Sequence, residues 1–292
     1  MQQTLVFDRA LIDRYDQSGP RYTSYPTAVQ FHEGFEAQAY AEAARESNTS
    51  GRPLSLYFHI PFCDTVCFYC ACNKIATKDR SKAQPYLQRV YRELEMQSAL
   101  FDDDRPVEQL HWGGGTPTFI SSAQMRELMA QTGRYFHLLD DDSGEYSIEI
   151  DPREVGDDTI GLLREVGFNR MSLGLQDLDP DVQRAVNRIQ TAEQTFGVLE
   201  SARREGFRSI SMDLIYGLPF QTPASFLRTL DSVIDAAPDR LSVFNYAHLP
   251  ERFLSQRSID RLTLPEPEEK LLLAQMISAT LQDAGYRYIG MD

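Results

Sequence analysis

Residues 54–72 read LSLYFHIPFCDTVCFYCAC, and they join a β-rich run to all four cysteines of the 292-residue chain. In LSLYFHI (54–60) apolar residues alternate with others, a pattern typical of a half-buried strand. The cysteines then follow at positions 63, 67, 70 and 72. The stretch predicts a strand whose carboxyl end leads directly into a loop that carries thiols.

The rest of the chain repeats this rhythm of strand, loop and helical pattern. Further β-rich runs are VEQLHW (107–112), EYSIEI (145–150), RMSLGL (170–175), SISMDLI (209–215) and RLSVFNY (240–246). Helical patterns lie near 81–101, 121–136, 157–166, 180–205, 222–236 and 266–284, whereas the first 50 residues show only weak periodicity. Because strands alternate regularly with helices, we expect an α/β fold whose parallel sheet is doubly wound or closed toward a barrel.

Unusual residues follow the carboxyl end of every predicted strand. They are PFC with the cysteines, GGGTPT, DPRE, QD, YGLP and AHLP. In parallel α/β barrels and open α/β sheets alike, binding and catalytic sites form at that end of the strands. Each turn alone is explained by ordinary turn chemistry, but their occurrence in all six units predicts one functional mouth.

Composition and charge narrow the class of protein. With 42% hydrophobic and 25% charged residues the chain is expected to be globular. A net charge of −14 lacks the basic face that nucleic acid or an anionic membrane requires, so we expect neither partner. The N-terminus lacks a signal-peptide core and no run reaches the length of a membrane span, so a cytoplasmic protein is predicted. In that reducing setting, clustered cysteines are metal ligands or catalytic groups more often than disulfides.

The cysteine spacing leaves several kinds of site open. A structural zinc ion usually takes two separated ligand pairs, and a thioredoxin-type dithiol CFYC (67–70) would leave two cysteines unused. His59 lies in the alternating strand and is expected to be buried or to support the site rather than to ligate. An iron–sulfur cluster fits better, because closely spaced thiolates can each reach a different iron. Three such ligands on a four-iron cluster would leave one iron open to react.

At this point the sequence resembles a known family. CDTVCFYC (63–70) matches the C-x-x-x-C-x-x-C motif of radical S-adenosylmethionine enzymes, in which Cys63, Cys67 and Cys70 would hold a [4Fe–4S] cluster. The chain further resembles the oxygen-independent coproporphyrinogen III oxidase family. That resemblance rests on SGPRYTSYPTA (18–28), LYFHIPFC (56–63), HWGGGTPT (111–118), SIEIDPRE (147–154), SLGLQD (172–177), VNR (186–188), DLIYGLPFQT (213–222) and LSVFNYAHLP (241–250).

The resemblance implies a fold and a reaction. The fold would be a partial (βα)6 barrel over residues 51–292, with residues 1–50 as an extension at its mouth. The family continues beyond the position of Asp292 with a helical domain, so we expect this chain to be a short or truncated member. The reaction would be an anaerobic, radical-driven oxidative decarboxylation in haem biosynthesis. It would convert two propionates of coproporphyrinogen III to vinyl groups, giving protoporphyrinogen IX.

The resemblance also assigns residues and partners. Cys72 and Tyr57 would be catalytic, and two S-adenosylmethionine molecules would be bound. An unidentified electron donor and acceptor are implied, and we expect a monomer. Arg21 is a candidate for the substrate carboxylates, because a substrate with four propionates must meet a protein of net charge −14. The implied S-adenosylmethionine contacts are Tyr57, Tyr69, Gly114, Gly115, Thr116, Glu149, Gln176, Arg188, Asp213 and Ala247.

Two alternatives remain open at this stage. A haem chaperone-like group shares the three-cysteine motif and binds haem without decarboxylation, but Cys72 and RYTSYPT (21–27) are typical of the oxidases. The second alternative is a non-enzymatic module that holds zinc or a cluster through all four cysteines.

Overall fold

The computed structural model describes residues 7–15, 25–156 and 158–290. Arg21 lies outside the described residues. Six strands form the body of one parallel sheet in the order β1-β4-β6-β7-β8-β9, and short β5 (His137–Leu138) pairs with β4. The strands are β1 (Leu54–Ile60), β4 (Pro106–Gly114), β6 (Glu145–Ile150), β7 (Arg170–Gln176), β8 (Ser209–Tyr216) and β9 (Arg240–Asn245). All six predicted strands are therefore confirmed, as is the α/β class.

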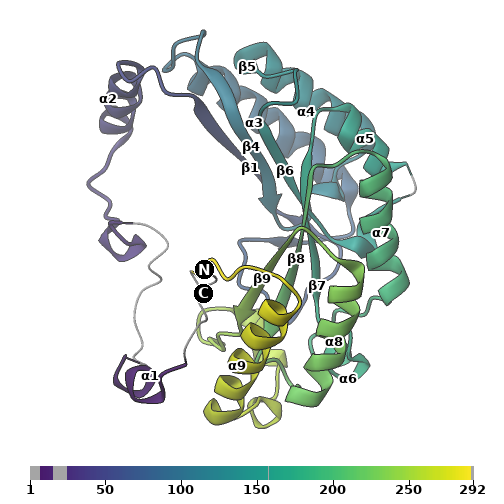
Figure 1. The fold of residues 1–292 in the computed structure, drawn as a ribbon. Helices are drawn as coiled ribbons and strands as arrows, with labels where there is room; N and C mark the ends of the chain where they lie inside the picture. The colour runs from purple at the N-terminus through teal and green to yellow at the C-terminus, as the bar shows by residue number, and fades with distance from the viewer. Residues whose placement is uncertain (1–6, 16–24, 157, 291–292) are drawn as a thin grey trace.

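Helices cover one face of the curved sheet (Figure 1). They are α3 (Ala83–Ser98), α4 (Ser122–Tyr135), α5 (Thr159–Glu165), α6 (Pro180–Ala185), α7 (Ala192–Arg204), α8 (Pro223–Ala236) and α9 (Pro267–Asp283). Strands β1 and β9 stand at the two ends of the strand order, so within the described residues the sheet is an open, partial barrel. The N-terminal segment carries α1 (Arg9–Tyr15) and α2 (Ala37–Asn48) (Figure 1). Arg9 of α1 pairs with Glu268 of α9, and the Tyr40 hydroxyl of α2 donates to Gln97 of α3.

One prediction about the helices is wrong. The pattern over 180–205 is not one helix but two, α6 and α7, separated by residues 186–191. Thr191 starts α7 with a capping box, in which its hydroxyl accepts from the Gln194 N–H and the Gln194 side chain accepts in return. Asn187 takes a left-handed φ of 53°, which ends the preceding helical run. The segment released by this break is used by the site.

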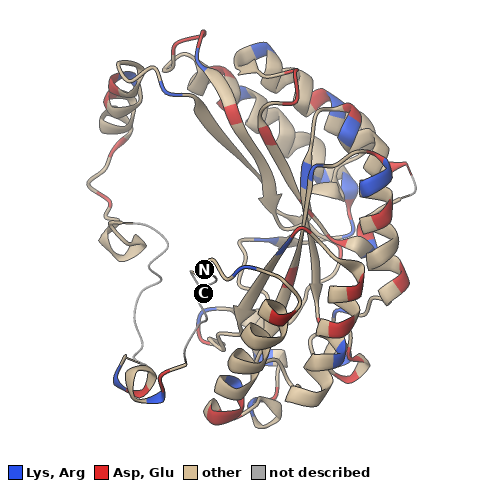
Figure 2. Ribbon diagram, in the orientation of Figure 1, with Lys and Arg blue, Asp and Glu red and all other residues tan. Residues whose placement is uncertain are grey.

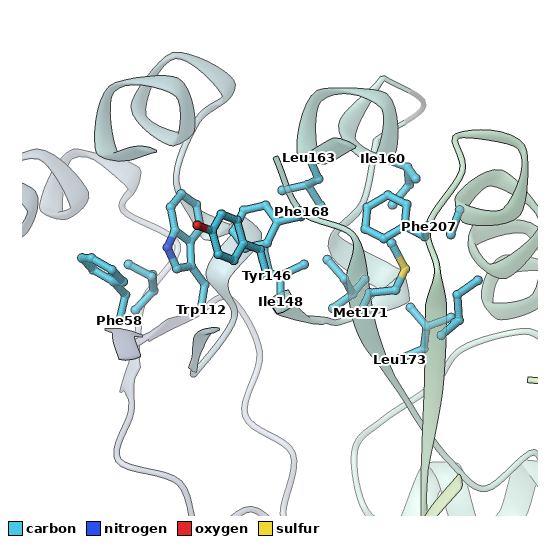
Figure 3. Close-up of a cluster of buried hydrophobic side chains, with 14 of the residues drawn as sticks. Phe58, Trp112, Tyr146, Ile148, Ile160, Leu163, Phe168, Met171, Leu173 and Phe207 are labelled. Atoms are coloured by element: carbon cyan, nitrogen blue, oxygen red, sulfur yellow. The ribbon is translucent and has the colours of Figure 1, made fainter. Parts of the chain in front are cut away.

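The core lies between the sheet and the outer helices. Trp112 of β4 is fully buried and meets the ring of Phe168 edge-on, with 4.9 Å between ring centroids. Phe58 of β1 approaches the other side of the indole at 6.3 Å (Figure 3). Because side chains alternate along a strand, burying these residues under the helices turns the intervening residues toward the other face.

That inner face is unusually polar for a parallel sheet. Strands β6, β7 and β8 alternate between buried and more exposed residues over most of their length, whereas parallel strands are commonly apolar on both faces. The half-exposed positions include Ser147, Glu149, Ser172 and Asp213. The sheet therefore offers hydrogen-bonding groups on the side away from the helices.

Candidate functional site

The polar residues of the inner face contact one another across neighbouring strands. His111 Nδ1 lies 2.6 Å from Ser147 Oγ, and His111 Nε2 lies 3.4 Å from Glu149 Oε1. The ring of Tyr57 stacks on His111 with 5.7 Å between centroids and 12° between planes. The Tyr57 side chain is nevertheless 59% exposed, so its outer face is open to a ligand.

Asp213 of β8 is the most enclosed carboxylate on this face. It accepts a hydrogen bond from Ser172 Oγ at 2.9 Å. Burial raises the pKa of Asp213 to about 6, although the hydrogen bonds from Ser172 and Ser242 act in the opposite direction. A cation or a set of hydroxyl donors placed beside it would relieve the cost of burying the charge.

The cysteine loop leaves the end of β1 and is closed at its base by two short paired strands. These are β2 (Phe62–Cys63) and β3 (Ile75–Ala76). The N–H of Ile75 donates to the carbonyl of Pro61 at 2.7 Å, and the N–H of Thr77 donates to the carbonyl of Cys63 at 2.9 Å. His59 also braces the loop, because its nitrogens lie 2.9 Å from the Tyr57 hydroxyl and 2.8 Å from the Asn73 carbonyl oxygen. Both ring nitrogens of His59 are thus occupied, as expected for a supporting rather than a ligating residue.

The segment between α6 and α7 holds the first half of the loop. Asn187, at its left-handed backbone position, donates from its side-chain amide to the Val66 carbonyl at 2.8 Å. The Phe68 N–H donates to the Val186 carbonyl at 2.9 Å. Ending the helix at residue 185 is what makes these groups available to the cysteine loop.

A second distant segment holds the other half of the loop. Ser255 Oγ donates to the Cys70 carbonyl at 2.9 Å. Gln256 is fully buried, and its amide nitrogen donates to the Tyr69 carbonyl at 2.9 Å and to the Ala247 carbonyl at 3.2 Å. Gln256 therefore joins the cysteine loop to the residues that follow β9.

Two arginines converge on the sulfur of Cys67. Arg153 and Arg188 donate to this sulfur at 3.4 Å and 3.5 Å. Asp151 links the two guanidinium groups, at 2.7 Å from Arg153 and 3.0 Å from Arg188. Burial alone would raise the pKa of Asp151, but the hydrogen bond from Arg153 and the charge of Arg188 hold that pKa below its ordinary value. Two guanidinium groups therefore lie beside the buried Cys67 sulfur, where their charge would stabilise a thiolate.

Arg188 is buried, with an exposed fraction of 7%, so it is not a surface residue. Its Nη2 also donates to the Gly174 carbonyl at 2.6 Å, so both terminal nitrogens are engaged. Its Nε is buried and has no hydrogen-bond partner among the described residues. The protein thus engages three of the five guanidinium N–H groups, and the Nε–H and one Nη2–H remain without a described acceptor.

The remaining thiols differ in environment. Cys63 accepts from the Thr116 hydroxyl at 3.6 Å, and burial raises its pKa to about 11. The hydrogen bond from the Cys72 thiol lowers the pKa of Cys70 to about 6, and the Cys72 N–H also donates to the Cys70 sulfur at 3.4 Å. Cys72 itself is exposed, and the hydrogen bond to Cys70 raises its pKa. In this geometry Cys72 is a hydrogen-bond donor to the Cys70 thiolate.

The donor set fits an iron–sulfur cluster. Three sulfurs follow one another on a single loop, and each accepts at least one hydrogen bond from the protein. In the described part of the chain, no three His, Cys, Asp or Glu side chains are placed to share one metal ion. A four-iron cube binds each thiolate on a different iron, so its ligands need not converge on one point. Metal binding would also deprotonate Cys63 despite its high pKa.

The glycine run at the end of β4 packs closely against β2, the short strand that contains Cys63. A Cβ atom at Gly115 would lie 2.7 Å from the Phe62 carbonyl oxygen and 2.8 Å from the Cys63 sulfur. The N–H of Gly114, at a φ of 121°, donates to Glu149 at 3.1 Å. The close approach that glycine permits at position 115 is therefore to the protein's own loop.

The structure brings the predicted contact residues to one mouth. Gly114, Gln176 and Ala247 lie at or just after the carboxyl ends of β4, β7 and β9, and Glu149 and Asp213 lie in the carboxyl-terminal halves of β6 and β8. Tyr69 lies on the cysteine loop. Gln176 holds a left-handed φ of 68° at a register shift between β7 and β8. Such a strained backbone in a residue other than glycine is common at functional sites.

Several residues of this site escaped the sequence analysis. Asp151 and Arg153 lie in DPRE, which helped to predict the mouth but was not resolved into site residues, and Asn187 lies in VNR, which contributed only to the resemblance. Ser255 and Gln256 lie in a stretch without any motif. The position of Asp151 and Arg153 after a strand end was the signal for those two residues, whereas nothing local marks Ser255 and Gln256.

A cavity of about 1040 Å³ opens beside this mouth. It lies between the residues that follow β9 and the start of α9, and Ala247 is part of its lining. The described residues contain no helix with the length and apolar character needed to cross a bilayer.

Comparison with known proteins places this site in a family. The model of the radical SAM superfamily matches residues 57–233. The oxygen-independent coproporphyrinogen III oxidase of Pseudomonas aeruginosa is 60% identical over all 292 residues, and that of Synechocystis is 42% identical over 289. The chain spans 64% of the length of the first relative and 62% of the second.

A solved structure agrees with these sequence relatives. Coproporphyrinogen III oxidase (HemN) from Escherichia coli, described as a radical SAM enzyme, superposes with a TM-score of 0.92 at 49% identity. The alignment covers 99% of this chain and 64% of that one. Since the family model covers more than half of the sequence, including the cysteine loop, the chain belongs to the radical SAM superfamily.

Proposed function

We propose that this chain is the catalytic core of an oxygen-independent coproporphyrinogen III oxidase. The observation that carries the proposal is the 60% identity to such an enzyme along the whole chain. The chain spans less than two thirds of that relative, so the substrate and the complete reaction belong to the proposal. In this proposal two propionates of coproporphyrinogen III become vinyl groups with loss of carbon dioxide.

Membership of the superfamily implies a [4Fe–4S] cluster and S-adenosylmethionine as cofactors. We propose Cys63, Cys67 and Cys70 as the cluster ligands. When bound, these cofactors supply the radical that removes a hydrogen atom from a substrate propionate. The guanidiniums at the Cys67 sulfur would compensate thiolate charge, and their burial would keep water from the ligand. Cys72 would remain outside the ligand set and support Cys70 as a donor.

The polar inner face would hold S-adenosylmethionine. Glu149 and Asp213 are suited to the ammonium group or the ribose hydroxyls, and the free Nε of Arg188 is suited to an acceptor atom. Tyr57 offers an exposed aromatic face beside them. Binding of two S-adenosylmethionine molecules, and the other predicted contacts, remain part of the proposal.

We also propose the following arrangement of the chain. Residues 51–292 would form the core, and the N-terminal segment would contribute to the mouth. Support comes from Arg9 of α1, which pairs with Glu268 at the start of α9 at 2.6 Å. A monomer in the cytoplasm with separate electron donor and acceptor completes the proposal, and size-exclusion chromatography tests the monomer.

Anaerobic reconstitution of the 292-residue chain with iron and sulfide tests the function. After addition of dithionite, S-adenosylmethionine and coproporphyrinogen III, we expect 5′-deoxyadenosine and carbon dioxide. The Cys67→Ser variant is the matched control and should yield neither product. Absence of 5′-deoxyadenosine from the wild-type chain would contradict radical chemistry. Formation of 5′-deoxyadenosine without carbon dioxide would contradict the decarboxylation by this chain.

A further inference from the structure

The cavity beside the mouth contains two cations that form no ion pair with a described residue. Acidic side chains are spread over the outer helices and their loops, whereas the strands are mostly uncharged (Figure 2). The net charge of −14 is therefore not concentrated on the inner face. The cavity lining contains three cationic side chains, Arg9, Arg261 and Lys270.

Most of the carboxylates in the cavity lining are already engaged. Arg9 is paired with Asp13 at 2.7 Å and with Glu268 at 2.6 Å. The side chain of Glu266 accepts a backbone N–H of the first turn of α9, as part of a capping box with Glu269. Three cations thus stand against four carboxylates in the lining, but neither Arg261 nor Lys270 forms an ion pair with a described residue.

Lys270 is the cation that the fold has positioned. It projects from α9 and is half-buried, with its ammonium donating to the Tyr246 carbonyl at 3.2 Å. Its stem passes so close to Gly217 that a Cβ there would lie 3.0 Å from Lys270 Cε. Among the described residues no carboxylate pairs with this ammonium, and burial lowers its pKa. A half-buried ammonium with one neutral acceptor has two more N–H groups for an anion.

Arg261 and His248 lie in the same part of the cavity lining. Burial lowers the pKa of His248, and the charges of Arg261 and Lys270 add to that effect. His248 Nδ1 lies 2.9 Å from the Tyr246 hydroxyl, which fixes the ring between these residues. Arg261 is exposed at the rim of the cavity and forms no ion pair with a described residue. Both cations thus act on the same small region beside Ala247.

We propose that Lys270 and Arg261 bind a carboxylate of a tetrapyrrole propionate that is retained in the product. The identity of the tetrapyrrole rests on the proposed function, and the cation pair itself rests on the geometry. A retained propionate fits better than a reacting one, because an ion pair stabilises the carboxylate and opposes its conversion to neutral carbon dioxide. The volume of about 1040 Å³ leaves room for part of a macrocycle as well as its side chain.

S-adenosylmethionine also carries a carboxylate, so the test must distinguish binding of a porphyrin propionate from binding of the S-adenosylmethionine carboxylate. Coproporphyrin III serves as a stable probe with the same four propionates, and its tetramethyl ester lacks their charge. Binding of both probes, and of S-adenosylmethionine, is measured on the reconstituted 292-residue chain by fluorescence and absorbance titration. Because no turnover is needed, this binding test is independent of the assay for the proposed function.

Lys270→Met should weaken binding of coproporphyrin III by about tenfold, as expected for loss of a charge-assisted hydrogen bond. Lys270→Arg should stay within about threefold of wild type, and the exposed Lys82→Met should bind as wild type does. Arg261→Gln, which replaces an exposed side chain, provides a second variant with little effect on folding and should weaken binding by a few fold. Binding of the tetramethyl ester and of S-adenosylmethionine should be unchanged in all four variants.

Several results would overturn the inference. Equal coproporphyrin III binding by wild type and Lys270→Met would do so while leaving the proposed function intact. Weaker S-adenosylmethionine binding with unchanged porphyrin binding would assign the cations to the cofactor instead. If the wild-type chain bound no coproporphyrin III, both the inference and the substrate assignment for this chain would fail.

Discussion

Gly115→Ala is the substitution whose effect can be worked out most directly from the structure. Position 115 does not have a left-handed φ, so alanine is acceptable to the backbone itself. The new methyl would lie 2.7 Å from the Phe62 carbonyl oxygen and 2.8 Å from both the Pro61 carbonyl oxygen and the Cys63 sulfur. Ordinary contacts begin near 3.4 Å, so backbone or sulfur must move by more than half an ångström.

That movement disturbs the pairing that positions Cys63. The Gly115 N–H donates to the Ile60 carbonyl at 2.9 Å, and the Thr116 N–H donates to the Phe62 carbonyl at 2.8 Å. Overpacking costs about 1–3 kcal/mol, and weakening two hydrogen bonds adds about 1 kcal/mol. We therefore expect a loss of about 3 kcal/mol in the free energy of unfolding, together with reduced iron incorporation.

Urea unfolding of the metal-free chain measures the first effect, and iron content after anaerobic reconstitution measures the second. Gly197→Ala is the matched control, because no atom lies within 4 Å of its new Cβ. It lies inside α7 and should stabilise the chain by about 1 kcal/mol. A Gly115→Ala chain with wild-type stability and full iron content would refute the steric reasoning.

Three further predictions concern buried charge and the ligand set. Arg188→Met leaves Asp151 with one guanidinium partner and should cost about 3 kcal/mol in urea unfolding; a loss below about 1 kcal/mol would contradict this. Because burial raises the pKa of Asp213 to about 6, the folded state holds the proton more tightly than the unfolded state. Ionisation of Asp213 then opposes folding, so the stability of Asp213→Asn relative to wild type should rise by about 3 kcal/mol between about pH 4 and pH 6 and stay constant above; a flat difference over that range would show that burial does not raise this pKa. Cys72→Ser should retain the iron that Cys67→Ser loses but impair turnover, and loss of iron from Cys72→Ser would show that the ligand set has four members.

The sheet could be predicted from the sequence because its signals are local. Alternation over six to eight residues located all six strands, and the residues at their carboxyl ends located the mouth. The break between α6 and α7 was missed, because an apolar pattern continues across it while Asn187 turns left-handed. The capping pair of Thr191 and Gln194 was the available signal for a second helix.

The environment of the thiols could not be predicted in the same way. Cys67 meets Arg188 from 121 positions away, and no local pattern specifies such a contact. The burial of Arg188 depends on Asp151 and Gly174, which come from two other strand ends. Spacing predicted which residues are ligands, whereas the charges around their sulfurs emerge only when the chain folds.

The hydrogen bonds that hold the cysteine loop come from residues that are synthesised long after the loop itself. Asn187 holds Val66 across 121 positions, and Gln256 holds Tyr69 across 187. At translation rates of about 5–20 residues per second, Gln256 is added roughly 10–40 s after Tyr69. During that interval the nascent thiols have their sequence spacing but not their final geometry. Iron delivered before residue 256 has docked would meet thiols on a flexible segment, so productive cluster insertion should follow the docking of residue 256.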